Sequence, residues 1–212
     1  MRDSARIIIF AAALGLVCSL MLTGATLLTA PFRQANEQAE EVRNFLSALE
    51  VDVDAEAEAS ELIEVFERTV KVKELGELTV YEYIPEGSTR AASVAAPFSG
   101  MGLWGPVKGV LALEPDLTSI RGIRFYQQEE TPGLGGEIGA VWFQDQFVKK
   151  KIVAEDGTPG FRIQKPGGST TNINSVDGIS GATMTSDRVA EMIDKLAHQL
   201  FKERDNYQKE QK

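Results

Sequence analysis

The sequence has very few side chains that bind metals or redox centres through imidazole or sulfur. Its 212 residues include one histidine, His198, and one cysteine, Cys18. Structural zinc sites use about four Cys or His ligands and iron–sulfur clusters use several thiolates, so both are excluded. His198 lies in an amphipathic helical run and is expected to be a partly buried structural residue. Because the one histidine is expected to be structural, a hydrolase lacks a plausible base, and a Ser-His-Asp enzyme is disfavoured.

Positive charge is also scarce. Lys and Arg total 22 against 31 Asp and Glu, which gives a formal net charge of -9. No basic stripe with interleaved aromatic residues occurs along the chain, so the electrostatic signature of a nucleic-acid-binding surface is missing. We therefore expect no nucleic-acid partner.

Charge is absent from residues 7–30. A helix over this segment would be long enough to cross the roughly 30 Å hydrocarbon core of a bilayer, and it is longer than the apolar part of a typical signal peptide. Arg2 and Arg6 precede the segment and acidic residues follow it, so the positive-inside rule places the N-terminus in the cytoplasm. We predict a cytoplasmic N-terminus and single-pass anchor over residues 1–33, in a bacterial inner membrane, with an extracytoplasmic C-terminal domain.

The rest of the chain predicts an α+β domain, in which a twisted antiparallel sheet is flanked by helices. Helical spacing with an acidic connector predicts a two-helix stalk over residues 34–76. A globular domain then covers residues 77–206, and a polar tail covers residues 207–212. The elements expected within the globular domain are a strand near residues 78–84, a hairpin turning at 114–116, a short amphipathic helix over 137–152, short strands at 160–164 and 171–176, and a closing helix over 186–204.

Three glycine-containing loops interrupt this scaffold, at Ser99–Gly105, Glu129–Glu137 and Asp177–Ser186. Glycine lets a backbone approach a ligand closely, although each loop alone could simply turn the chain. None of them has the G-x-G-x-x-G frame of a dinucleotide-binding fold. The third loop runs into the closing helix, whose first turn offers unpaired N–H groups and the positive end of the helix dipole. From the residues alone, this third loop predicts an anion site.

The third loop also carries a specific motif. Residues 177–183 read D-G-I-S-G-A-T, which resembles the D-x-x-(S/T)-G-A-T motif of the FMN-binding domain family. In that family a flavin transferase esterifies the last threonine with FMN phosphate. The segments ETPGLGGEI and GMGLWG resemble the other hallmark loops of one branch, the FMN-carrying subunit, designated C, of sodium-translocating NADH:quinone oxidoreductases. A sister branch, the subunit designated G in Rnf-type electron-transport complexes, often has a histidine where this chain has Gln128. The sodium-pump branch is therefore favoured, and the Rnf branch stays as the alternative.

The resemblance implies a membrane-anchored electron-transfer subunit with FMN bound covalently to Thr183 and without an NADH site of its own. Its implied partners are the membrane, other membrane subunits of the redox complex and a flavin transferase for maturation. Asp177 is expected to shape the attachment loop or to assist the transferase. The other residues expected around the flavin are Ser180, Gly181, Ala182, Met184 and Thr185 at the phosphate, Leu103, Trp104 and Leu134 as apolar contacts, and Glu130, Thr131 and Gly135 as hydrogen-bonding partners of ring or ribityl atoms.

A second copy of the motif's last four letters lies in the apolar segment. Residues 23–26 read TGAT, but Leu20 stands where the motif requires aspartate. A charged phosphate there would cost at least several kcal/mol in hydrocarbon, so Thr26 is expected to be unmodified.

A noncovalent, membrane-anchored adaptor module stays open as a function of a different class. Trp104 could also be a core residue, and Glu130 could instead cap a local turn.

Overall fold

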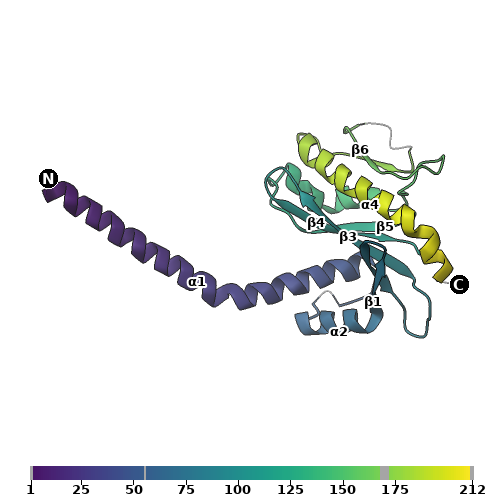
Figure 1. Ribbon diagram of the computed structural model, residues 1–212, viewed down its shortest axis with the longest axis horizontal. Helices are drawn as coiled ribbons and strands as arrows, with labels where there is room; N and C mark the ends of the chain where they lie inside the picture. Colours follow the sequence, from purple (N-terminus) through teal and green to yellow (C-terminus); the bar gives the residue numbers. More distant parts are fainter. Residues whose placement is uncertain (1, 55, 168–171, 211–212) are drawn as a thin grey trace. The chain divides into compact units, whose positions relative to one another are not determined.

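The structure is a computed structural model and describes residues 2–54, 56–167 and 172–210. The chain divides into two compact units, residues 1–39 and residues 40–212, and each is described by itself (Figure 1).

The first unit is part of one long helix, α1 (Arg2–Ala48), which continues through Pro31. From Ser4 onward this helix contains an 18-residue window with a mean hydropathy of 2.4, and no part of that window is buried. Within the described residues it is the one helix long and apolar enough to cross a membrane. Thr26 donates its hydroxyl hydrogen to the carbonyl of Leu22 at 2.9 Å.

The second unit is built on a five-stranded antiparallel sheet in which each strand pairs with the next along the chain (Figure 1). This arrangement confirms the predicted fold class, including the hairpin at residues 114–116. A separate pair of short parallel strands lies later in the chain. The strands of the sheet are β1 (Val70–Leu75), β2 (Leu78–Tyr83), β3 (Ser93–Met101), β4 (Pro106–Leu113) and β5 (Ile120–Gln127), and the parallel pair is β6 (Arg162–Gln164) and β7 (Ser175–Asp177).

Helices cover both faces of the sheet (Figure 1). The long helix α4 packs on one face, and α2 with the last residues of α1 packs on the other. The helical elements after α1 are α2 (Ala59–Thr69), α3 (Val141–Gln144), α4 (Thr183–Glu210) and two 3₁₀ turns, η1 (Gly135–Gly139) and η2 (Asp145–Phe147).

Alternation along the strands divides the core in two, because successive side chains of a strand point to opposite faces. On β3, Val94 and Phe98 belong to the core under α4, whereas Ala95 belongs to the core under α2. Phe45 and Leu62 fill that second core. The sheet is therefore buried on both sides, which explains the nearly continuous apolar run of β4.

Two predictions about the first half of the domain are wrong in detail. Residues 70–75 are a strand rather than the end of a helical stalk, because VKVKEL alternates with the two-residue period of a strand and pairs along its whole length with β2. Strand β3, which includes the first residues of the predicted loop at Ser99, was not predicted from the sequence. Moreover, residues 40–48 and α2 pack on the sheet, so much of the segment expected to be a stalk belongs to the compact unit.

Three predictions about the second half also need correction. The expected helix over 137–152 is broken into short pieces, because Ala140 has extended backbone angles between η1 and α3. The expected polar tail begins with Tyr207, which is fully buried within α4 and lies under the Lys73 ammonium at 4.7 Å. His198 is exposed rather than partly buried, and its Nε2 lies 3.7 Å from a carboxylate oxygen of Asp194.

Candidate functional site

Two of the three predicted loops leave the same end of the sheet. The turn 102–105 joins β3 to β4, and the segment from Gln128 follows β5. In an antiparallel sheet of this order, the end of β3, the start of β4 and the end of β5 all lie at the same end of the strands. The third loop, residues 178–182, connects β7 to the first residue of α4.

The start of α4 presents Thr183 to solvent. The first turn of a helix leaves N–H groups without partners inside the helix, so this end suits an anionic group. The loop before it is held from within, since Ser186 Oγ accepts a hydrogen bond from the Ile179 amide at 3.1 Å. Ala182 is buried, whereas Ser180, Gly181 and Met184 are exposed around the threonine.

A small cavity of about 110 Å³ lies beside Thr183. It is lined by Gly178, Ile179, Ser186 and Asp187 together with residues 163–166. Lys165, one of these, is exposed and supplies a positive charge at the rim. Lys165 was not selected from the sequence, because its closeness to Thr183 arises from the pairing of β6 with β7.

Asp177 ends β7 and is held by its backbone rather than by its carboxylate. Its amide donates to Gln146 Oε1 at 3.0 Å, and Gln146 Nε2 donates to its carbonyl at 3.2 Å. One carboxylate oxygen, Oδ1, is buried and has no hydrogen-bond partner among the described residues. Buried acceptors without donors are rare in folded proteins, and a functional role is one of the explanations for them. Gln146 was not found from the sequence, since it lies 31 positions away.

Glu130 links the three loops and is only 5% exposed. Its Oε1 accepts hydrogen bonds from the amides of Leu103 at 2.8 Å and Trp104 at 3.1 Å. Its Oε2 accepts the hydroxyl hydrogen of Thr185 at 2.6 Å. Both oxygens therefore already have protein donors, whereas the resemblance led us to expect contacts with flavin atoms.

The second and third loops also touch each other directly. A Cβ added to Gly181, whose φ is +79°, would lie 3.1 Å from Leu134 Cδ2. Leu134 is 43% exposed and Trp104 is 69% exposed, so the tryptophan is not a core residue. Leu134 thus lies beside the loop that precedes Thr183, and the turn that carries Leu103 and Trp104 is joined to Thr185 through Glu130. Thr131 is exposed, and its backbone carbonyl accepts hydrogen bonds from the amides of Leu134 and Gly136.

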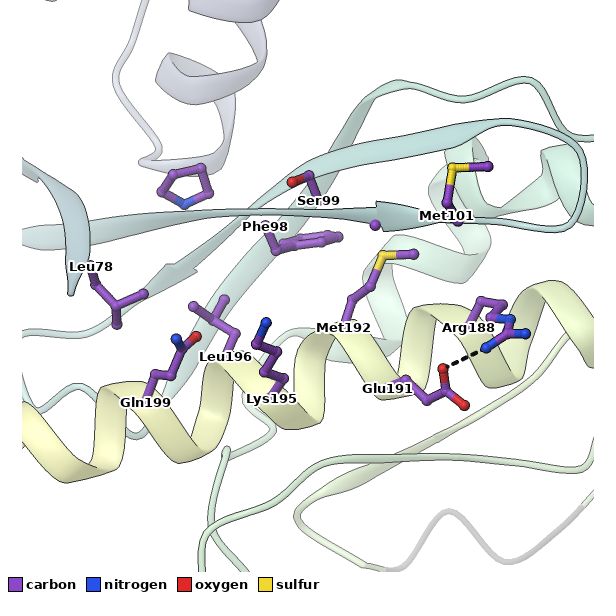
Figure 2. Close-up of a pocket in the computed structure, with 12 residues that line it drawn as sticks. Leu78, Phe98, Ser99, Met101, Arg188, Glu191, Met192, Lys195, Leu196 and Gln199 are labelled. Atoms are coloured by element: carbon purple, nitrogen blue, oxygen red, sulfur yellow. Dashed lines mark hydrogen bonds and ion pairs between the residues drawn. The ribbon is translucent and has the colours of Figure 1, made fainter.

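A separate groove of about 340 Å³ runs between β3 and α4 (Figure 2). Phe98, Met192 and Leu196 line it, and Arg188 at one end pairs with Glu191 at 3.0 Å. None of the flavin residues predicted from the sequence lines this groove. It therefore lies outside the candidate site.

Comparison with known proteins supports the family prediction. Residues 102–198 match the model of the FMN-binding domain family, which agrees with the resemblance of the attachment motif. The Na(+)-translocating NADH-quinone reductase of Vibrio alginolyticus has a subunit, designated C, that is 37% identical over 116 residues, which are 55% of this chain and 45% of that protein. The subunit of the same name from Neisseria meningitidis serogroup A is 40% identical over 105 residues, or 49% and 40% of the two chains. The chain thus aligns with less than half the length of these curated relatives.

Two solved structures share the fold. The subunit of the same name from Parabacteroides distasonis superposes with a TM-score of 0.66 at 27% identity, covering 82% of this chain and 94% of that one. NqrC of Shewanella oneidensis superposes with a TM-score of 0.68 at 22% identity, covering 81% of this chain and 99% of that one.

Proposed function

We propose, from the match of residues 102–198 to the FMN-binding domain family, that this chain is a membrane-anchored electron-transfer subunit with FMN bound covalently to Thr183. The complex we propose for it is a sodium-translocating NADH:quinone oxidoreductase, the complex named in its curated relatives. The observation that carries the proposal is the exposed Thr183 hydroxyl at the first residue of α4, at the end of the D-G-I-S-G-A-T segment.

The residues present fit a flavin phosphate and ring. Thr183 would provide the ester oxygen, and the unpaired amides of the first helical turn would face the phosphate. The exposed side chains of Leu103, Trp104 and Leu134 would cover the apolar ring. Bound FMN supplies the redox chemistry, while the protein holds it, excludes water and tunes its potential.

The span of α1 from Ser4 supports the anchor, since its apolar window is unburied and long enough for a bilayer. We propose that its N-terminus is cytoplasmic and that residues 40–212 lie outside the cytoplasm. A covalent link is useful in that compartment, because a dissociated cofactor would be lost.

The attachment is tested with the full chain produced together with a flavin transferase. On a denaturing gel under ultraviolet light, we expect a fluorescent band that disappears in Thr183→Ala. The matched control is Thr26→Ala, which removes the threonine of the second TGAT segment and should keep the band. A dark wild-type band would reject the covalent carrier and favour the noncovalent adaptor. A band that survives in Thr183→Ala would reject Thr183 as the attachment residue.

The topology is tested in intact cells by labelling with a membrane-impermeant maleimide. Cys18 is first replaced by alanine, and Glu155→Cys then supplies a single thiol at an exposed position of the second unit. Labelling before lysis supports an extracytoplasmic domain. Labelling only after lysis would place the domain on the other side.

A further inference from the structure

The Glu130 carboxylate has an unusual set of partners for a buried acidic group. Its three donors are the amides of Leu103 and Trp104 and the hydroxyl of Thr185, all of them neutral. These donors come from the turn 102–105 and from the first turn of α4. A hydrogen bond to a carboxylate is stronger than one between neutral groups. One side chain therefore joins two segments that have no backbone connection near the site.

Glycines provide the space for this carboxylate. A Cβ on Gly102 would lie 2.4 Å from Glu130 Oε1. A Cβ on Gly135 would lie 2.6 Å from Oε2 and 2.5 Å from Thr185 Oγ1. Neither glycine has a positive φ. The absence of side chains at these two positions is therefore required by the close approach of the carboxylate and not by the backbone conformation.

The carboxylate is also oriented by its own loop. The Glu130 amide donates to Gln128 Oε1 at 2.6 Å, which fixes the backbone just before the side chain turns inward. Across the 102–105 turn, the amide of Gly102 donates to the carbonyl of Gly105 at 2.8 Å. The turn is thus closed on itself, and the amides of its two central residues donate to Glu130.

The link that Glu130 forms between the 102–105 turn and the first turn of α4 leaves the outward-facing groups of both segments free. Leu103 and Trp104 are held by their backbone amides, while the two residues stay 42% and 69% exposed. Thr185 is 1% exposed and Thr183 is exposed, because residues two positions apart on a helix lie about 200° apart around it. The link therefore holds the inner side of the helical turn and leaves the Thr183 hydroxyl accessible.

We propose that Glu130 is a positioning residue that fixes the 102–105 turn against the start of α4 and so holds Leu103 and Trp104 where the flavin ring lies. This inference rests on the proposed function for the flavin itself. The fixing of the turn is independent of it. Apolar groups fixed in advance bind a ring with a smaller loss of conformational freedom.

The test compares Glu130→Ala, Glu130→Gln and Thr185→Val with the wild type in the full chain produced with a flavin transferase. Glu155→Gln, at an exposed position of the same unit, is the matched control for loss of an acidic charge. Hydrogen exchange of the Leu103 and Trp104 amides reports on the turn. The absorption spectrum and the midpoint potential of the bound flavin report on the ring environment.

We expect the two amides to exchange at least about tenfold faster in Glu130→Ala, as for loss of a hydrogen bond to a charged acceptor. The flavin spectrum and potential should shift in the same variant. Glu130→Gln should restore most of the protection, because its carbonyl oxygen still accepts from both amides and its NH₂ group can donate to Thr185 Oγ1. The control should match the wild type.

Unchanged amide protection together with an unchanged flavin spectrum in Glu130→Ala would overturn the inference. If that variant does not fold, Thr185→Val decides, since it breaks the link to α4 and keeps both amide bonds. An unchanged flavin spectrum there would also overturn it. A wild-type chain without flavin would instead reject the proposed function, and the amide exchange would still decide whether Glu130 fixes the turn.

Discussion

Replacement of Thr185 by valine isolates one hydrogen bond of the site. The substitution removes the hydroxyl that donates to Glu130 Oε2 at 2.6 Å and keeps the shape of the side chain. Thr185 is 1% exposed and Glu130 is 5% exposed, so solvent cannot readily replace the lost donor. A hydrogen bond to a charged group contributes about 1.5–3 kcal/mol, and we take about 2 kcal/mol for this one. For a folded unit of this size, the melting temperature should fall by roughly 4–8 °C.

Both tryptophans, Trp104 and Trp142, lie in the unit formed by residues 40–212, so intrinsic fluorescence follows its unfolding. The assay is urea unfolding of the full chain in detergent. Thr185→Ser is the control, because it keeps the hydroxyl and loses only a methyl group, at a cost of about 1 kcal/mol. A free energy of unfolding within about 0.5 kcal/mol of the wild type in Thr185→Val would refute the reasoning. A double-mutant cycle with Glu130→Gln then measures the coupling between the two side chains.

Three further predictions concern the rest of the domain. Tyr207→Ala should lower the free energy of unfolding by about 3–5 kcal/mol, because the ring is fully buried; a loss below about 1 kcal/mol in urea titration would restore the polar-tail interpretation. Gly102→Ala should cost about 1–3 kcal/mol through its contact with Glu130, whereas Gly122→Ala, with nothing within 4 Å of its Cβ, should be nearly neutral in the same titration. Burial alone would raise the pKa of Asp116, but hydrogen bonds from Ser119 and Thr118 bring it below its usual value of 3.8. The lowered pKa of Asp116 stabilises the fold above the unfolded value of 3.8, and this contribution is lost as the pH falls through the lower folded pKa. Asp116→Asn should therefore be less stable than wild type at about pH 7, and the difference should be smaller at about pH 3. An equal gap in urea midpoints at both pH values would contradict this.

Local sequence patterns were enough to predict the elements whose conformation is determined by residues close together in the chain. The apolar segment of α1, the hairpin at 114–116 and the main part of α4 follow from hydrophobic period and turn residues. In contrast, the strand at 70–75 follows directly on α2, and its short VKVKEL alternation was interpreted as part of the helical segment. Pairing with β2 determines its conformation, and that partner cannot be recognised from the segment itself.

The same limit applies to the site. The attachment motif is contiguous, so Thr183 could be selected from the sequence. The partners of Glu130 are separated from it by 26, 27 and 55 positions, so no local spacing predicts them. Glu130 itself was selected from its loop motif, as a residue expected beside the flavin. Its contacts with protein donors follow only from the meeting of two sheet loops with α4.

The first turn of α4 combines two roles that single substitutions should separate. Thr183 is exposed and Thr185 is buried. Thr183→Ala should therefore abolish flavin attachment in chains made with the transferase, while in chains made without it the free energy of unfolding should stay within about 0.5 kcal/mol of the wild type. Thr185→Val should destabilise the domain and yet leave the Thr183 hydroxyl available for attachment, as peptide mass mapping after production with the transferase would show. If Thr183→Ala instead destabilised the fold as much as Thr185→Val does, the threonine would be part of the packed core, and its role as an accessible attachment site would have to be abandoned.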